Sequence, residues 1–158
     1  MATLRIGILT CSDTRTAAQD TAGAALRELA EDHGWEVAAY RLCPDERDCI
    51  ETALIAMADA DRCDVVFTTG GTGLSPRDVT PEATLAVCDR EVPGIAEAIR
   101  MESLAITKRA MLSRGAAAMR GTTLVINMPG SEKAVRESFA VVAAQLEHAV
   151  DMMAGLGH

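Results

Sequence analysis

The sequence predicts an α/β fold, a Rossmann-like three-layer α/β/α domain in which a mostly parallel sheet lies between two layers of helices. Short apolar runs rich in β-branched residues alternate along the chain with longer segments of helical period. This alternation is typical of parallel sheets that are covered on both faces. The 158 residues contain no internal repeat, low-complexity tract or linker, so residues 1–158 are expected to form a single domain.

The first half of the chain is expected to contain three strands and two helices. Residues 4–10, 37–42 and 64–69 are short apolar runs with the length of a buried strand. Residues 20–33 place apolar side chains on one helical face and are followed by a glycine, which favours a helix end. Apolar residues recur at helical spacing in residues 50–58, so a second helix is expected there.

The second half begins with a helix start in which Thr80 is the expected cap and Pro81 occupies the first helical position. This helix is expected to end near Asp89. The other elements are a helix at 95–107, a segment at 110–120 that fits a strand or a loop, a strand at 122–127 and a long last helix that includes 135–150.

Charge and aromatic content narrow the classes of ligand. The formal net charge is −8 and only 3% of the residues are aromatic. Proteins that bind nucleic-acid backbones need a positive field along the whole contact, and single-strand binders need aromatic side chains on which bases stack. The composition therefore argues against nucleic acid as a partner and leaves room for a small anionic ligand that is bound locally.

Cysteine usage and hydropathy favour the cytoplasm. The five cysteines are odd in number and form no C-x-x-C pair, so neither a disulfide framework nor a zinc site is expected. Residues 1–9 contain one arginine and too short an apolar run for a signal peptide. No stretch of about 20 apolar residues is present to span a bilayer, so no membrane partner is expected.

Four unusual polar loops follow predicted strands. In an open parallel sheet, ligands bind in the crevice outside the carboxyl ends of the strands. Because all four loops fall at that edge, their coincidence is more informative than any single one. The loops are Cys11-Ser12-Asp13-Thr14, Pro44-Asp45-Glu46, the segment from Gly70-Gly71-Thr72-Gly73 to Asp78, and Asn127-Met128-Pro129-Gly130-Ser131.

The glycine-rich segment 70–73 has the composition of a phosphate-binding turn. Glycines allow positive φ and a close approach of successive N–H groups to an anion. The segment matches neither a Walker A loop nor a G-x-G-x-x-G fingerprint, since Pro76 stands where the last glycine would be. A simple tight strand exit remains an alternative. The arginine, aspartate and helix start that follow within a few residues favour an anion site.

Asp45 and Asp78 are candidate ligands of Mg²⁺. Each lies on a loop after a strand, and Mg²⁺ prefers one or two carboxylates together with substrate phosphates. The alternatives are structural: Asp45 would cap the helix that begins near Glu46, and Asp78 would pair with Arg77. Asn127 likewise either contacts a ligand or holds the turn before Pro129-Gly130.

Taken in order, these loops resemble the MogA/MoaB family of molybdopterin adenylyltransferases of molybdenum cofactor biosynthesis, which includes the G domain of the plant enzyme. The resemblance extends over nearly the whole chain and is carried most strongly by residues 68–84, TTGGTGLSPRDVTPEAT. The other matching segments are Ser12-Asp13, Pro44-Asp45-Glu46, Glu91-Val92-Pro93-Gly94, Met111-Leu112-Ser113-Arg114 and Asn127-Met128-Pro129-Gly130. The resemblance implies a three-layer fold of the molybdopterin-binding type.

The resemblance implies transfer of AMP from Mg-ATP to the terminal phosphate of molybdopterin, with adenylyl-molybdopterin and pyrophosphate as products. ATP and molybdopterin are then the substrates and Mg²⁺ the cofactor, and Asp45 and Asp78 match the catalytic, magnesium-associated aspartates of the family. The matching ligand-binding positions are Ser12, Asp13, Gly70, Gly71, Thr72, Gly73, Ser113, Asn127, Pro129 and Gly130.

This chemistry needs no histidine base. A phosphate monoester is largely anionic near neutral pH, since its second pKa is about 6. In-line positioning is then sufficient, together with neutralisation of the triphosphate by Mg²⁺ and by basic side chains such as Arg77 and Arg114.

Three alternatives remain at the level of the sequence. Some short MoaB-type members of the family bind without adenylylating, so the chain is either an enzyme or a pterin- or nucleotide-binding protein. A detached relative of the similar domain in molybdenum-insertion or competence-damage proteins fits the Asp-Val-Thr-Pro run less well. An NAD-binding Rossmann domain requires a spaced glycine fingerprint after the first strand, where this chain has Thr10-Cys11-Ser12-Asp13.

The resemblance also implies a homotrimer or homohexamer and a downstream molybdenum-insertion protein as a partner.

Overall fold

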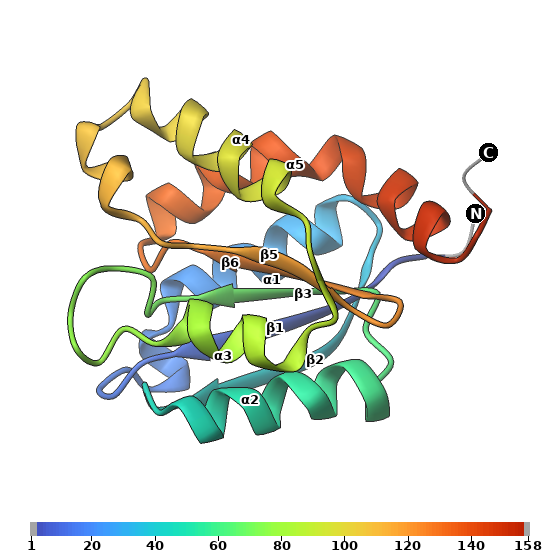
Figure 1. Ribbon diagram of the computed structural model, residues 1–158, viewed down its shortest axis with the longest axis horizontal. Coiled ribbons are helices and arrows are strands. Elements are labelled where there is room, and N and C mark those ends of the chain that lie inside the picture. Colours follow the sequence, from blue (N-terminus) through green and yellow to red (C-terminus); the bar gives the residue numbers. More distant parts are fainter. Residues whose placement is uncertain (1–2, 157–158) are drawn as a thin grey trace.

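The computed structural model, which describes residues 3–156, contains a six-stranded sheet in the order β2-β1-β3-β6-β5-β4 (Figure 1). Strands β1, β2, β3 and β6 are parallel, whereas β5 runs antiparallel to β6 and β4 antiparallel to β5. The fold class predicted from the sequence is therefore confirmed. The strands are β1 (Arg5–Cys11), β2 (Glu36–Cys43), β3 (Val65–Thr69), β4 (Arg90–Glu91), β5 (Ala117–Arg120) and β6 (Thr123–Met128).

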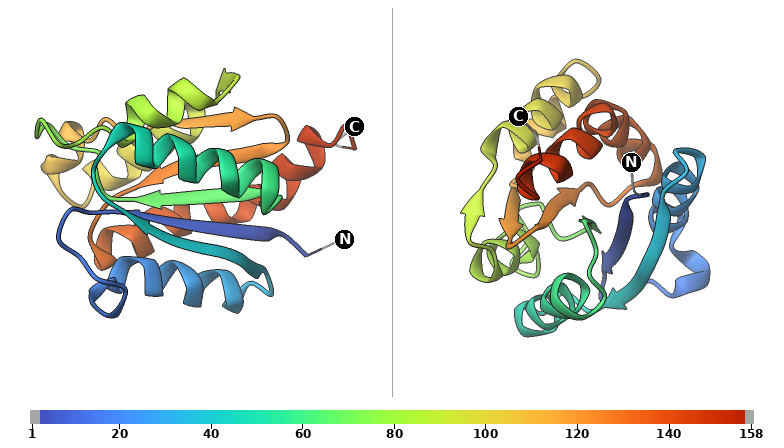
Figure 2. Two further views of the ribbon diagram at one scale, coloured as in Figure 1. Left: turned by 90° about the horizontal axis from the view of Figure 1, so that it is seen from below. Right: turned by 90° about the vertical axis from the view of Figure 1, so that its right-hand side faces the viewer.

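Helices cover both faces of the sheet (Figures 1 and 2). α1, α4 and α5 pack on one face, and α2 and α3 pack together on the other. The helices are α1 (Thr21–Asp32), α2 (Arg47–Ile55), α3 (Thr80–Val87), α4 (Pro93–Leu104) and α5 (Glu132–Met153), with short turns η1 (Ala17–Gln19), η2 (Ala56–Ala60) and η3 (Lys108–Leu112). Within residues 3–156, no helix has the length and apolar character needed to cross a membrane.

The two faces of β3 supply the centre of two separate cores. All five residues of this strand are buried, as expected of a central parallel strand. Phe67 belongs to the core beneath α1 and α5, whereas its neighbour Val66 belongs to the core beneath α2 and α3. Successive side chains of a strand point to opposite faces, so β3 is the common wall of both layers.

The few aromatic residues are concentrated in the first of these cores. The ring of Phe139, on α5, lies 5.6 Å from that of Phe67 and 5.9 Å from that of Trp35 between ring centroids. Phe139 is only 2% exposed. A chain with two phenylalanines and one tryptophan thus uses all three to join α5 to the sheet.

Three local predictions need correction or completion. Thr80 does not cap α3: the helix begins at Thr80 after Val79, and no side chain caps it. The open segment 110–120 contains the end of η3, a loop and the strand β5. The two-residue strand β4 was not predicted, because its Arg90 and Glu91 are both exposed and carry no apolar signal.

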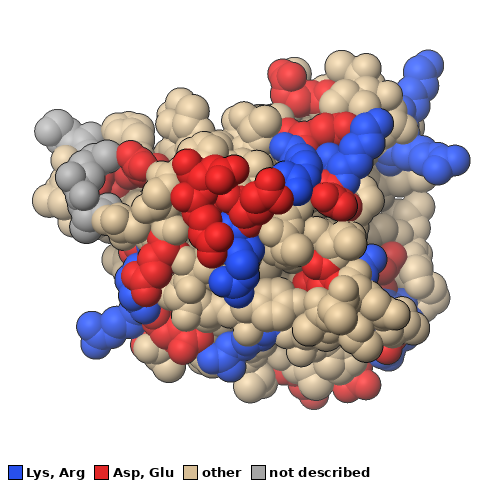
Figure 3. Space-filling view, turned by 180° about the vertical axis from the view of Figure 1, so that it is seen from behind, with Lys and Arg blue, Asp and Glu red and all other residues tan. Residues whose placement is uncertain are grey.

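The surface behind the sheet carries charges of both signs. Figure 3 shows acidic side chains gathered there with lysines and arginines between them. Across α1 and α5, Arg136 lies 2.9 Å from Glu28 and 3.2 Å from Glu132. Since the basic groups of these helices have acidic neighbours of this kind, this face does not present the continuous positive field that a nucleic-acid backbone requires.

Phe139→Ala is expected to lower the free energy of unfolding by about 3–5 kcal/mol, because it opens a cavity between α5 and β3. Urea denaturation followed by circular dichroism measures the loss. Met101→Ala is the matched control, since Met101 is 71% exposed and its truncation should change stability by no more than about 0.5 kcal/mol. Equal effects of the two substitutions would contradict the assignment of Phe139 to the core.

Candidate functional site

The carboxyl ends of four parallel strands bring the predicted polar loops to one edge of the sheet, at the left in Figure 1. Cys11, the last residue of β1, is the register partner of Cys43 at the end of β2. Thr69, the last residue of β3, pairs with Thr10 of β1 and with Met128 of β6. The four loops therefore start side by side, as their position after strands predicted.

The glycine-rich loop, residues 70–78, turns sharply over the end of β1. Gly70 and Gly71 have φ values of 92° and 71°, a region that favours glycine. A Cβ atom on Gly70 would collide with the carbonyl oxygen of Cys11, and one on Gly71 with the hydroxyl of Thr80. Only glycine thus fits both the conformation and the space at these two positions.

The same loop leaves amide groups available for an anion. Within residues 3–156, the backbone N–H groups of Thr72 and Gly73 donate to no protein acceptor. Unpaired amides next to left-handed glycines are typical of anion-binding turns. If the glycines served only to make a tight turn after the strand, Gly70 and Gly71 would be explained but the free amides of the next two residues would not.

Arg77 pairs with Asp13 and not with its neighbour Asp78. Its Nε and Nη2 donate to the two carboxylate oxygens of Asp13 at 3.0 and 2.8 Å. The backbone N–H of Asp45 also donates to Asp13, at 2.9 Å. The Arg77 guanidinium holds the pKa of Asp13 below its usual range. Asp13 therefore ties together the loops that follow β1, β2 and β3.

Asp45 has an unpaired oxygen that is buried beside the glycine-rich loop. Its Oδ1 and the Oγ1 of Thr80 are buried and have no hydrogen-bond partner in the described part of the chain. A Cβ atom on Gly71 would lie 3.2 Å from Asp45 Oδ1 and in contact with Thr80 Oγ1, so both oxygens border the space that the missing side chain leaves. Buried polar atoms without partners are rare and mark places where a ligand, ion or water belongs.

Negative charge is in excess around the Asp45 carboxyl. Burial raises the pKa of its carboxyl above the ordinary value, and the nearby carboxylates of Asp13 and Asp78 add to this rise. Arg77 offsets it only in part, because its guanidinium is already paired with Asp13. A cation between Asp45 and Asp78 would remove the repulsion.

The structural alternatives for the two aspartates are not what the structure shows. Asp45 does not cap α2, whose N-cap is Glu46 and whose cap makes no side-chain hydrogen bond. Asp78 accepts a hydrogen bond from the backbone N–H of Ser75 at 3.1 Å, and its predicted partner Arg77 faces Asp13. Both carboxylates thus remain candidates for binding a cation.

The donor set fits Mg²⁺ better than a metal held by protein alone. No group of three or more His, Cys, Asp or Glu side chains within residues 3–156 is arranged to hold a metal. Mg²⁺ commonly binds to one or two carboxylates and completes its shell with water and substrate phosphates. Asp45 and Asp78 are the residues that would hold it, with the unpaired hydroxyl of Thr80 beside them.

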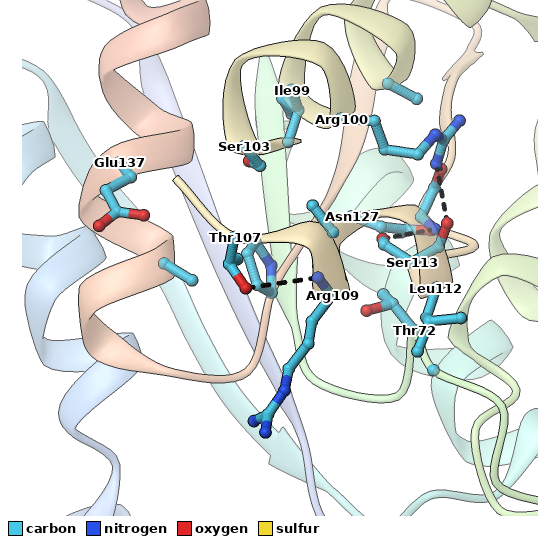
Figure 4. Close-up of a pocket in the computed structure, with 16 residues that line it drawn as sticks. Thr72, Ile99, Arg100, Ser103, Thr107, Arg109, Leu112, Ser113, Asn127 and Glu137 are labelled. Atoms are coloured by element: carbon cyan, nitrogen blue, oxygen red, sulfur yellow. Dashed lines mark hydrogen bonds between the residues drawn. The ribbon is translucent and has the colours of Figure 1, made fainter. Parts of the chain in front are cut away.

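A pocket of about 300 Å³ opens next to the glycine-rich loop (Figure 4). It lies between α4, η3, the start of α5 and the loops that precede β5 and follow β6. Thr72 and Gly73 belong to its wall, so a ligand that fills it reaches the free amides. Its polar lining includes Arg100, Ser103, Arg109, Ser113 and Glu137.

Asn127 holds the wall of this pocket together. Its Nδ2 donates to the hydroxyls of Thr68 and Thr84 at 3.0 Å, and its Oδ1 accepts from the backbone N–H of Ala116 at 3.1 Å. The predicted structural role of Asn127 is therefore present, although the bonds differ from the expected turn. Direct contact between Asn127 and a ligand stays a prediction, as does that of Ser113, whose Oγ accepts from Gly115 N–H at 3.2 Å.

Other predicted ligand residues organise the neighbouring loops. The Oγ of Ser12 accepts from the backbone N–H of Arg15 at 3.0 Å and so closes its own turn. The carbonyl of Pro129 accepts from the Thr69 hydroxyl at 2.7 Å. A Cβ atom on Gly130 would lie 3.5 Å from the Cα of Gly70, so the two glycine loops touch.

Sequence reasoning missed the contribution of α4 to the pocket. Ala96, Arg100 and Ser103 of α4 line the pocket at a spacing of four and three residues, which is the repeat of one helical face. That spacing is visible in the sequence of the predicted helix at 95–107 and is the signal that was available. Arg109 on η3 and Glu137 on α5 carry no comparable signal.

Comparison with known proteins agrees with this geometry. A family model described as "Probable molybdopterin binding domain" matches residues 7–148. The molybdopterin adenylyltransferase of Helicobacter pylori (strain J99) is 41% identical over 159 residues, which cover 98% of this chain and 90% of that protein. The molybdopterin adenylyltransferase of Escherichia coli (strain K12) is 42% identical over 148 residues, which cover 87% of this chain and 73% of that protein.

A solved structure shows the same fold. The crystal structure of the molybdopterin biosynthesis enzyme MoaB from Thermus thermophilus is 48% identical and superimposes with a TM-score of 0.88, covering 96% of this chain and 97% of that one. The resemblance inferred from the loops is thus confirmed. The chain belongs to the molybdopterin-binding family of molybdenum cofactor biosynthesis proteins.

Proposed function

We propose that this protein transfers AMP from Mg-ATP to the terminal phosphate of molybdopterin, giving adenylyl-molybdopterin and pyrophosphate. The observation that carries the proposal is the buried, unpaired Oδ1 of Asp45, which lies near Asp78 and beside the glycine-rich loop with its free amides. The relatives that are named molybdopterin adenylyltransferase support the same reaction.

The two substrates would meet at the glycine-rich loop. The pocket lined by Arg100, Arg109 and Ser113 accommodates the pterin, because it is concave and ends at Thr72 and Gly73, whose amides suit a phosphate group. The triphosphate would bind on the side of the loop where the two aspartates lie. A phosphate of the pterin would then approach the α-phosphate of ATP across the loop.

The residues of the site act by positioning. A phosphate monoester is already largely anionic near neutral pH, since its second pKa is about 6, so no side chain has to remove a proton from it. Asp45 and Asp78 would hold Mg²⁺, which neutralises charge on the triphosphate when bound. Asp13 fixes the backbone of Asp45 through the 2.9 Å hydrogen bond, and this bond orients the carboxylate.

The expected assembly and location are separate from this reaction. A homotrimer or homohexamer, a downstream molybdenum-insertion protein as partner, and the cytoplasm as compartment stay predictions. They rest on the family resemblance and on the composition of the chain.

The direct test is to incubate the protein with molybdopterin, ATP and Mg²⁺ and to detect adenylylated pterin by mass spectrometry. We expect stoichiometric release of pyrophosphate. Tight binding of the pterin without any product would contradict adenylyl transfer and would identify the protein as a MoaB-type binding protein.

Asp78→Ala and Asp45→Asn are each expected to lower the rate of AMP transfer at least about 100-fold, because each removes a carboxylate that holds the cation. Binding of molybdopterin should change by less than about threefold, since neither side chain lines the pterin pocket. Pyrophosphate release and isothermal titration measure the two quantities. Asp32→Asn, an exposed carboxylate at the end of α1, is the control.

The acidic limb of the pH–rate profile should depend on Asp45. Only the ionised carboxylate holds a cation, so Mg²⁺-dependent transfer is lost as the pH falls through the raised pKa of Asp45, above the ordinary 3.8. Asp13→Asn removes a neighbouring negative charge, which lowers this pKa, and the limb should move to lower pH. Activity measured against pH, with a ¹³C NMR titration of the Asp45 carboxyl, checks the shift. Movement to higher pH would refute this account of the charge balance.

A further inference from the structure

Arg114, which lies between two residues that line the pterin pocket, contacts both ends of the segment from Gly73 to Asp78. Its Nε donates to the carbonyl oxygen of Gly73 at 2.8 Å, and its Nη2 donates to that of Asp78 at 2.7 Å. Its Nη1 donates to both carboxylate oxygens of Glu82, at 2.9 and 2.7 Å. One guanidinium therefore holds the two ends of the loop between Gly73 and Asp78 and fixes both to the first turn of α3.

Apart from Arg114, the loop between Gly73 and Asp78 is attached to the rest of the fold by the ion pair of Arg77 with Asp13. Its tip is exposed, and Leu74 alone is 66% exposed. Inside the loop, Ser75 N–H donates to Asp78 Oδ2 at 3.1 Å and Asp78 N–H donates to the Ser75 carbonyl at 2.9 Å. These bonds fix Asp78 relative to the loop but not relative to the sheet. The ion pair of Arg77 with Asp13 links the loop to its neighbours, but it lies on the surface, where such pairs contribute little to stability.

The segment that carries Arg114 is itself well anchored. Arg100 Nη1 donates to the carbonyl of Gly115 at 2.7 Å, and the side chain of Asn127 binds Ala116 N–H. The backbone N–H of Arg114 donates to the carbonyl of Thr72 at 2.8 Å. Arg114 therefore attaches the loop that carries Asp78 to a segment that is itself hydrogen-bonded to β6 and α4.

We propose that Arg114 is a positioning residue that sets the place of Asp78 for AMP transfer and mechanically links the pterin pocket to the cation site. The inference rests on the proposed function. It replaces the expectation that Arg114 neutralises the triphosphate, because the guanidinium is committed to Glu82 and to two backbone carbonyls. The planar fork of arginine can hold all three partners at once, whereas the point charge of lysine cannot.

Arg114→Lys therefore tests the role while keeping the positive charge. We expect kcat to fall about 10- to 100-fold, because a displacement of a catalytic group by about 1 Å has effects of this size. The Mg²⁺ concentration for half-maximal rate should rise, and the Kd for molybdopterin should stay within about threefold of wild type. Unchanged kcat and unchanged Mg²⁺ dependence would overturn the proposal.

Glu82→Gln separates positioning from direct phosphate binding. If Arg114 positions the loop, loss of the charged partner weakens the clamp, and the variant should shift kcat and Mg²⁺ dependence in the same direction as Arg114→Lys. The two effects should be less than additive in the double variant, since both remove one interaction. If Arg114 binds the triphosphate instead, freeing its guanidinium should lower the KM for ATP, and that result would overturn the proposal.

Arg120→Lys is a matched control for general loss of stability. Arg120 makes the same kind of cluster, with two bonds to Asp59 at 3.1 and 2.7 Å and one to the carbonyl of Val87 at 2.7 Å. It lies on β5, away from the glycine-rich loop. We expect a melting temperature lowered to a similar degree in both arginine variants, with kcat and Mg²⁺ dependence changed only in Arg114→Lys.

Hydrogen exchange in the free protein tests the clamp without any substrate. The amides of Ser75 and Asp78 are hydrogen-bonded inside the loop and should exchange faster in Arg114→Lys than in wild type or in Arg120→Lys. Equal exchange in all three proteins would refute the clamp. Absence of product in the wild-type assay would instead refute the proposed function, so the two failures are distinguishable.

Discussion

The passage of the chain over the end of β1 at Gly70 and Gly71 is the constraint on which the site depends. A side chain at either position would meet the carbonyl of Cys11 or the hydroxyl of Thr80. Because the chain passes this close, α3 starts directly above the sheet edge, and Thr80 comes to face Asp45. The place of the Thr80 hydroxyl beside Asp45 therefore follows from backbone geometry after β3.

This arrangement keeps the Asp45 carboxyl in a place that disfavours its charge. Burial and like-charge neighbours both raise the pKa of Asp45, so a cation held beside this carboxylate would stabilise its ionised form. The free-energy cost of burying this charge is offset by packing elsewhere in the fold, in particular by the aromatic core between α5 and β3 and by the fully buried central strand. Functional sites commonly hold such local strain on a stable scaffold.

Much of this could be predicted from the sequence, and the exceptions have physical reasons. Strands β1, β3 and β6 were predictable because buried parallel strands are continuous apolar runs, and the loops after strands contained Asp13, Asp45 and Asp78. Strand β5 was not, because it is short and antiparallel, so Ser113 and Arg114 reach the site by preceding a strand. The partners of Arg77 and Arg114 lie 64 and 32 residues away, and no local pattern specifies contacts over such separations.

The buried amide of Asn127 has a consequence for how variants of this site are interpreted. It connects β3, α3 and the segment before β5 through three hydrogen bonds. Its removal would leave the hydroxyls of Thr68 and Thr84 without this donor in the interior, and the pocket would change shape as a whole. A weakened affinity in an Asn127 variant would therefore report the architecture of the cavity, and ligand contacts are better mapped by truncating other side chains that line it, such as Ser103.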